Sequence, residues 1–193
     1  MAEQNVFLLL FKIMGKLVLI KLILATPWLI WLSVIDFRKR ELPNSLTLGG
    51  AAVMAVIALA VNVNYLLGSL LTAFLVSLFL LLPFFLRAAG AGDVKMLFVA
   101  GLIAGPGCTL NLILLVSLAG LILAAVMLCL KQVDPARLKH FLRSLFDYRY
   151  DRAEGRKNLP PKDSENCRVP FGAAIAAGLW CNLVIQLVYT WGM

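Results

Sequence analysis

The sequence predicts an all-α polytopic membrane protein with about six transmembrane helices, of which the fourth is short. Of the 193 residues, 62% are hydrophobic and 15% are charged, whereas soluble domains average roughly 45–50% and about 25%. Uncharged stretches at residues 42–86, 96–130 and 169–193 each exceed the roughly 20 residues that cross a bilayer. We therefore expect residues 1–193 to form a single membrane domain.

The first helix is predicted over residues 17–35, a stretch whose only charged residue is Lys21. No basic segment opens the chain and no small-residue cleavage site follows the apolar stretch, so we expect this helix to be retained and not removed as a secretory signal. The aliphatic stem of Lys21 is long enough for the ammonium group to extend to the outer interface, and we expect it to do so.

The stretch at 42–86 is too long for one helix and predicts two. A polar break at residues 62–65 contains two asparagines, whose short side chains favour turns. Pro43 and Asn44 stand where the second helix should begin, and both residue types suit the amino-terminal end of a helix.

The stretch at 96–130 is interrupted by Gly-Pro-Gly at 105–107, which leaves residues 108–130 as a full-length fifth span. The part before the break, residues 96–104, would form only about 14 Å of helix, roughly half of the hydrocarbon thickness. The fourth helix must therefore begin earlier, near Asp93, or end part-way in a water-accessible cavity. The sixth span follows at 169–193 and ends in aromatic residues typical of the membrane interface.

The basic residues predict the orientation. Of the 18 lysines and arginines, all but three follow the first helix, lie between the third and fourth helices, or belong to the loop at 131–168. Because such residues are enriched in cytoplasmic loops, we expect these loops to face the cytoplasm and both termini to lie outside. The three that oppose this orientation are Lys12, Lys16 and Lys21.

The loop at 131–168 is the longest polar segment. Apolar side chains recur at helical spacing over about 135–148, with basic residues between them. This pattern predicts an amphipathic helix on anionic lipids, with substrate docking as the alternative. His140, the chain's one histidine, is expected to be a surface residue. The four cysteines form no C-x-x-C pair, so we expect neither a zinc ribbon nor a redox site.

Acidic residues are scarce where the helices lie. Between residues 4 and 133 they are Asp36, Glu41 and Asp93. An ionisable residue in or beside a span costs a few kcal/mol and by default suggests a functional site. Asp36 ends the first helix, where a carboxylate faces the negative end of the dipole, so it is not a cap of that helix. Asp93 begins the fourth helix, where N-capping is a structural alternative.

Two carboxylates in a low-dielectric site hold one proton between them and so supply an acid and a base. One can activate water while the other polarises a peptide carbonyl, which gives hydrolysis without a metal, a cofactor or a covalent intermediate. No serine of the spans has a histidine partner, and the sequence contains no phosphate-binding loop. We therefore predict Asp36 and Asp93 as catalytic residues, and expect no metal, no cofactor and no nucleic-acid partner.

Three segments carry a family resemblance: Asp36 followed by L-P-N at 42–44, G-A-G-D-V-K-M at 90–96, and P-F-G at 170–172. With them the sequence resembles the type IV prepilin peptidases, the GxGD class of intramembrane aspartyl proteases. The residues that this resemblance implies in substrate binding or in shaping the site are Pro43, Asn44, Gly90, Gly92, Lys95, Pro170 and Gly172. We expect Gly90 and Gly92 to adopt positive φ and to admit an extended substrate backbone.

The resemblance implies a bacterial inner-membrane enzyme that cleaves the leader from prepilins or pseudopilins at the cytoplasmic face. Longer family members carry a further cytoplasmic region with paired cysteines and also N-methylate the product. This chain has no such pair, so it is more similar to the short peptidase-only enzymes of tight-adherence and Flp pilus systems.

Two functions of other classes remain open on the residues alone. A small transporter could use Asp36 and Asp93 as a proton or cation relay, because the same burial argument applies to it. A non-catalytic subunit of an assembly machine is the other alternative. Cleavage of a prepilin by a membrane preparation would distinguish the peptidase from both. The sequence does not indicate an oligomeric state or a particular pilin.

Overall fold

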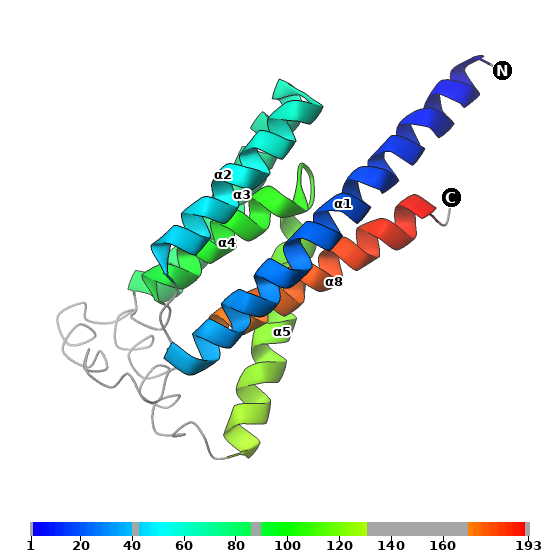
Figure 1. Cartoon of the computed structure of the whole chain (residues 1–193). Coiled ribbons are helices and arrows are strands. Elements are labelled where there is room, and N and C mark those ends of the chain that lie inside the picture. Colours follow the sequence, from blue (N-terminus) through cyan, green and yellow to red (C-terminus); the bar gives the residue numbers. More distant parts are fainter. Residues whose placement is uncertain (1, 40–42, 86–89, 131–169, 192–193) are drawn as a thin grey trace, which may run out of the picture.

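The computed structural model describes residues 2–39, 43–85, 90–130 and 170–191, and every element within these ranges is a helix (Figure 1). Five of the helices are long and apolar enough to cross a membrane, and the 14-residue α4 is the exception. The predicted all-α polytopic membrane fold, with a short fourth helix, is confirmed. The helices are α1 (Ala2–Lys39), α2 (Asn44–Val61), α3 (Val63–Phe85), α4 (Ala91–Ala104), α5 (Thr109–Cys129) and α8 (Phe171–Trp191).

Both predicted breaks within the apolar stretches are present. Between α2 and α3, the side-chain oxygen of Asn62 accepts the backbone N–H of Asn64 at 3.1 Å, which is the local bonding that makes asparagine a turn residue. Between α4 and α5, Gly105 and Gly107 have φ angles of 92° and 78°. Only glycine adopts such angles readily, so this tight reversal depends on those two positions.

The short helix α4 lies at the centre of the bundle. It packs against α2, α3 and α8, and all its residues from Met96 to Ala104 except Phe98 are buried. At 1.5 Å per residue its 14 residues span about 21 Å. It starts at Ala91, two residues before Asp93, so the helix does begin earlier than the uncharged stretch, as one of the two predicted alternatives required.

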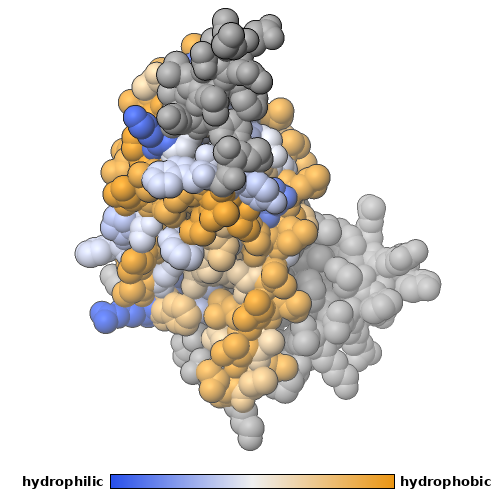
Figure 2. Space-filling model, turned by 90° about the vertical axis from the view of Figure 1, so that its right-hand side faces the viewer, coloured by the Kyte–Doolittle hydropathy of each residue, from blue (hydrophilic) through white to orange (hydrophobic). Residues whose placement is uncertain are grey.

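The outer surface of the helices is apolar, as expected of a surface that faces lipid (Figure 2). Large hydrophobic side chains such as Ile23, Val56 and Leu121 are more than half exposed. In a bilayer, water does not drive the helices together, so their association depends on close packing between them. Gly101 allows α4 to approach α3 closely, since an added Cβ would lie 2.5 Å from the Cα of Ala73.

Helices α1 and α8 pack antiparallel, and the amino-terminal part of α1 extends beyond the end of α8 (Figure 1). At one end, a Cβ on Gly15 would lie 3.0 Å from the indole nitrogen of Trp191. At the other end, the side chain of Asp36 accepts a hydrogen bond from the backbone of Ala173. The amino-terminal part of α1 and the carboxyl-terminal end of α8 therefore lie at the same end of the bundle.

The expectation for Lys21 was wrong. Its side chain is 2% exposed and turns into the bundle, where it donates a hydrogen bond to the carbonyl of Ile103 at 2.8 Å. The reason is that α4 ends inside the bundle and presents carbonyl acceptors there, which the sequence of α1 could not reveal.

Several predictions fall outside the described residues. These are the loop at 131–168 with its amphipathic helix at about 135–148, the placement of His140, and the environment of Glu41. They stay predictions, as does the single-domain organisation of residues 1–193.

Replacing Gly101 with valine should destabilise the protein by about 1–3 kcal/mol, because the added side chain would press on the backbone of α3. Thermal unfolding in detergent measures this as a lower melting temperature. The matched control is Gly49→Val on α2, where an added Cβ meets nothing within 4 Å. Equal melting temperatures for the two variants would contradict the close approach of α3 and α4.

Candidate active site

One end of the bundle collects the amino-terminal ends of three helices. The residues that immediately precede α2, α4 and α8 are Pro43, Gly90 and Pro170. The backbone is extended at Pro43 and at Gly90. Each of the three residues accepts a backbone N–H from the first turn of its helix. Proline and glycine suit these positions because the first backbone N–H groups of a helix have no partner within it. All three positions were predicted to shape the site, and they lie at the ends of neighbouring helices.

Asp36 lies near the carboxyl-terminal end of α1 and is 5% exposed. Its Oδ2 accepts the N–H of Ala173 at 3.3 Å, an N–H that the carbonyl of Pro170 also accepts at 3.2 Å. As predicted, Asp36 does not cap its own helix. It caps α8 instead and lies at the positive end of the dipole of α8. The backbone of Ala173 was not among the predicted site groups, although the N–H groups of the first helical turn after Pro170 need an acceptor from outside that turn.

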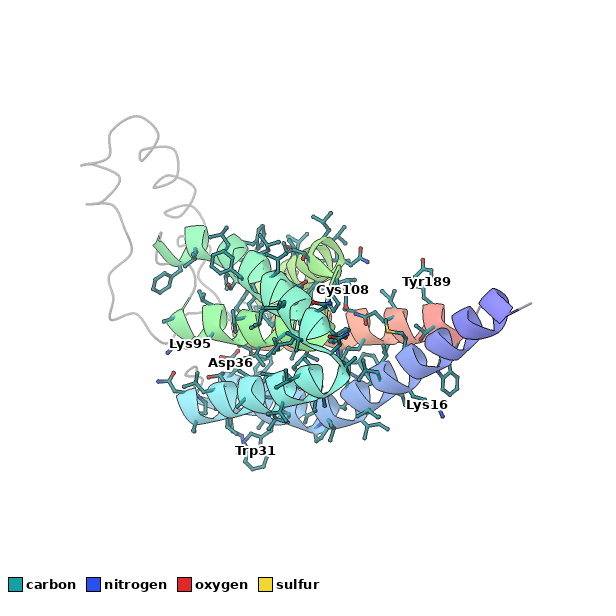
Figure 3. The ribbon with its side chains drawn as sticks, turned by 90° about the horizontal axis from the view of Figure 1, so that it is seen from above. Lys16, Trp31, Asp36, Lys95, Cys108 and Tyr189 are labelled. Atoms are coloured by element: carbon teal, nitrogen blue, oxygen red, sulfur yellow. The ribbon has the colours of Figure 1, made fainter. Side chains whose placement is uncertain are left out.

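Gly172 lies between Asp36 and α4. A Cβ on Gly172 would come within 2.7 Å of Asp36 Oδ2 and 3.3 Å of Met96 Sδ. The carboxylate and the thioether therefore flank a residue that has no room for a side chain. Met96 is one helical turn beyond Asp93, so the contact places Asp36 at the level of the first turns of α4. Figure 3 shows Asp36 at the same end of the bundle as Lys95.

Asp93 occupies the first turn of α4 and is partly buried. Its Oδ2 accepts the N–H of Gly90 at 2.9 Å, and its own N–H donates to the carbonyl of Gly90 at 3.2 Å. The structural role of N-terminal capping is therefore real. An ionised carboxylate offers about four acceptor positions, so capping by itself does not argue against a second role for Asp93.

Lys95 and Asn44 form a contact between α4 and α2. The ammonium of Lys95 donates to the side-chain oxygen of Asn44 at 2.9 Å, across 51 positions in the sequence. Both side chains are exposed, and Lys95 lies at the end of the bundle that carries Asp36 (Figure 3). The structure thus joins two of the predicted site-shaping residues directly, and the bond ties the start of α2 to the start of α4.

The expectation of positive φ at Gly90 and Gly92 was wrong. Gly90 has φ −83° and ψ 157°, and Gly92 lies within the first turn of α4. Among the described residues, positive φ is found at Gly105 and Gly107. The reason is that α4 begins at Ala91, which gives Gly92 helical dihedral angles. At Gly90 the absent side chain matters in another way, because a Cβ would lie 3.3 Å from Asp93 Oδ2.

A recess of about 270 Å³ opens beside the first turns of α4. Val94, Lys95 and Phe98 line it from α4, and Thr47 and Ala51 line it from α2. Its walls are almost entirely apolar. Within the described part of the chain, no group of three histidine, cysteine or acidic residues could hold a metal ion. The described ionisable groups at this end of the bundle include the carboxyl groups of Asp36 and Asp93 and the ammonium group of Lys95.

Comparison with known families identifies the chain. Residues 23–125, more than half of the sequence, match the type IV leader peptidase family. The chain belongs to this family. The matched region includes both Asp36 and Asp93 and ends before α8. The match therefore says nothing of Pro170 and Gly172 in this leader peptidase, and only their contacts in the structure place them at this end of the bundle. No significant match to a curated protein or to a solved structure was found.

Substituting Gly172 with alanine should reduce peptidase activity by about tenfold or more, because the added methyl group would displace the carboxylate of Asp36. Cleavage is measured at matched enzyme levels in membranes. The control is Ala177→Val, an exposed position on the same helix, which should leave activity unchanged. Full activity in Gly172→Ala would show that the position of Asp36 is unimportant.

Proposed function

We propose that this leader peptidase is an intramembrane aspartyl endopeptidase that removes the leader from type IV prepilins or pseudopilins, with Asp36 and Asp93 as its catalytic pair. The main support is the contact that Gly172 makes with both Asp36 and Met96, because it brings the buried acid of α1 to the part of α4 that carries Asp93. Each acid also caps the start of a helix, Asp93 at α4 and Asp36 at α8, and these hydrogen bonds hold the two carboxylates in place.

In the proposed reaction, one carboxylate removes a proton from water as the water oxygen attacks the scissile carbonyl carbon. The other carboxyl group, protonated, donates a hydrogen bond to the carbonyl oxygen as negative charge develops there. The C–N bond then breaks, and a carboxyl group of the pair gives its proton to the leaving nitrogen. The hydrogen bond from Ala173 holds Asp36 in position, and that from Gly90 holds Asp93.

The substrate must meet the two acids as extended backbone. A helix hides its carbonyls in internal hydrogen bonds, so the peptide bond becomes accessible only where the chain is unwound. Irregular backbone at membrane depth is tolerated only inside protein or beside water. We propose that Pro43, Asn44, Gly90, Gly92 and Lys95 shape the site for this segment, because they lie at the starts of α2 and α4, beside the recess that Lys95 lines.

The proposed location is the bacterial inner membrane, with the active site at the cytoplasmic face and both termini outside. The antiparallel pairing of α1 and α8 supports a common side for the two termini, and the basic loops predict which side is cytoplasmic. The loop at 131–168 would bind anionic lipids. We propose peptidase activity without N-methylation, because the four cysteines form no closely spaced pair.

Asp36→Asn and Asp93→Asn should each lower the cleavage rate of a prepilin by about 10²–10⁴-fold, because one remaining carboxyl cannot act as both acid and base. Single-turnover cleavage in detergent measures the loss. The control is Glu41→Gln, which removes the third acid of this part of the sequence and should retain most activity. A near-normal rate in either asparagine variant would exclude the catalytic pair, and a transporter in place of a peptidase would give no cleavage even in the wild type.

The orientation can be tested by cysteine labelling of intact cells, after the native cysteines are replaced. A cysteine at Arg38 should be protected from an impermeant thiol reagent, and one at Asn64 should react, because both positions are exposed at opposite ends of the bundle. Permeabilised cells provide the control for reactivity at Arg38. Labelling of Arg38 from outside would place the acids on the wrong face for a cytoplasmic leader peptidase.

A further inference from the structure

A buried lysine lies far from the two acids and has no part in the chemistry proposed above. Lys21 belongs to the membrane-spanning part of α1, Met14–Arg38, and is 2% exposed. A charged side chain in a span costs a few kcal/mol and is rarely retained without a role. The region that matches the family begins at residue 23, so the match does not account for Lys21.

The Lys21 ammonium has two partners inside the bundle. It donates to the carbonyl of Ile103 on α4 at 2.8 Å and to the hydroxyl of Tyr65 on α3 at 2.7 Å. Three helices therefore meet at this one group. The turn that follows α4 is shaped around it, because a Cβ on Gly105 would lie 2.6 Å from the Tyr65 hydroxyl and 3.2 Å from the Lys21 nitrogen.

The carboxyl-terminal end of α4 needs such partners because it stops inside the bundle. The last carbonyl groups of a helix have no backbone N–H donor within the helix. The bilayer interior supplies no water to take the place of that donor. Lys21 satisfies Ile103, and the side-chain nitrogen of Gln186 on α8 donates to the carbonyl of Ala104 at 3.1 Å. A cation at this position also interacts favourably with the negative end of the helix dipole.

Lys21 and Asp36 both belong to α1, whereas Asp93 and Ile103 both belong to α4. Helices α1 and α4 are therefore joined directly at the Lys21 end and through Gly172 at the Asp36 end. A slip of α4 by one residue would shift Asp93 by about 1.5 Å and rotate it by about 100°. Such a displacement exceeds the tolerance of a catalytic arrangement.

We propose that Lys21 is a positioning residue: by anchoring the carboxyl-terminal end of α4 to α1, it keeps Asp93 in register with Asp36. It acts through α4 and does not touch the substrate. The inference rests on the proposed catalytic pair. It goes beyond that pair by assigning a function to a polar cluster at the opposite end of α4.

The decisive variant is Lys21→Met, which keeps a long apolar stem and removes the donors. We expect kcat to fall about tenfold with KM within twofold of the wild type. The two midpoints of the pH–rate profile should move closer together, because the interaction between two carboxyls weakens as they separate. A merely structural role would reduce the amount of folded enzyme and leave the profile of the remainder unchanged. Lys16→Met, at an exposed position on the same helix, is the control and should match the wild type.

Gly105→Ala tests the same anchor from the other side. Its added methyl group would press on the Tyr65 hydroxyl and the Lys21 nitrogen, and the φ of 92° at this position would strain the turn that carries the end of α4 once a side chain is present, so it should reproduce the loss of kcat and the altered pH profile. Wild-type kinetics in both Lys21→Met and Gly105→Ala would overturn the positioning role.

Amide hydrogen exchange of the full-length protein in detergent tests the anchor without reference to activity. Lys21→Met should increase exchange in the last turns of α4 by about tenfold or more, and Lys16→Met should not. If the wild type cleaves no prepilin, the proposed function fails while exchange still tests the anchor. Unchanged exchange in Lys21→Met would overturn the anchor. Increased exchange with unchanged kcat and pH profile would overturn its role in positioning Asp93.

Discussion

The architecture of this leader peptidase depends on one constraint: α4 is too short to cross the hydrocarbon, so both of its ends must be satisfied by the protein. Its 14 residues span about 21 Å against a core of roughly 30 Å. Backbone groups left unpaired at membrane depth cost several kcal/mol each. Neighbouring helices therefore have to supply polar groups to an otherwise apolar bundle, and Lys21 and Gln186 do so at the carboxyl-terminal end of α4.

At the amino-terminal end of α4, part of this requirement is met by one of the side chains proposed to carry the chemistry, and the other proposed acid caps α8. Asp93 caps α4 through Gly90, and Asp36 caps α8 through Ala173. Capping and catalysis are compatible, because the hydrogen bond that caps a helix also fixes the orientation of the carboxylate that makes it. The structural explanation of each acid thus also explains how it is held in place.

At the carboxyl-terminal end, donors are required instead of acceptors, and Lys21 and Gln186 provide them from α1 and α8. These are the two helices that also reach the amino-terminal end of α4, through Asp36 and Gly172. Side chains or backbone of α1 and α8 therefore lie near both ends of the short helix. Small residues such as Gly101 bring α3 close along its length, which leaves little freedom for α4 to slide.

The sequence by itself determined the fold class, the breaks between helices, the shortness of α4 and the candidate acids, because hydropathy, turn residues and scarce charges are local properties. The family resemblance also rested on local motifs and was confirmed by the match over residues 23–125. Only the tertiary structure decided the partners of Asp36, the inward turn of Lys21 and the pairing of Lys95 with Asn44. Even the local prediction of positive φ at Gly92 failed, because it required the exact start of α4. Each of these features depends on where another helix begins or ends, and no single segment contains that information.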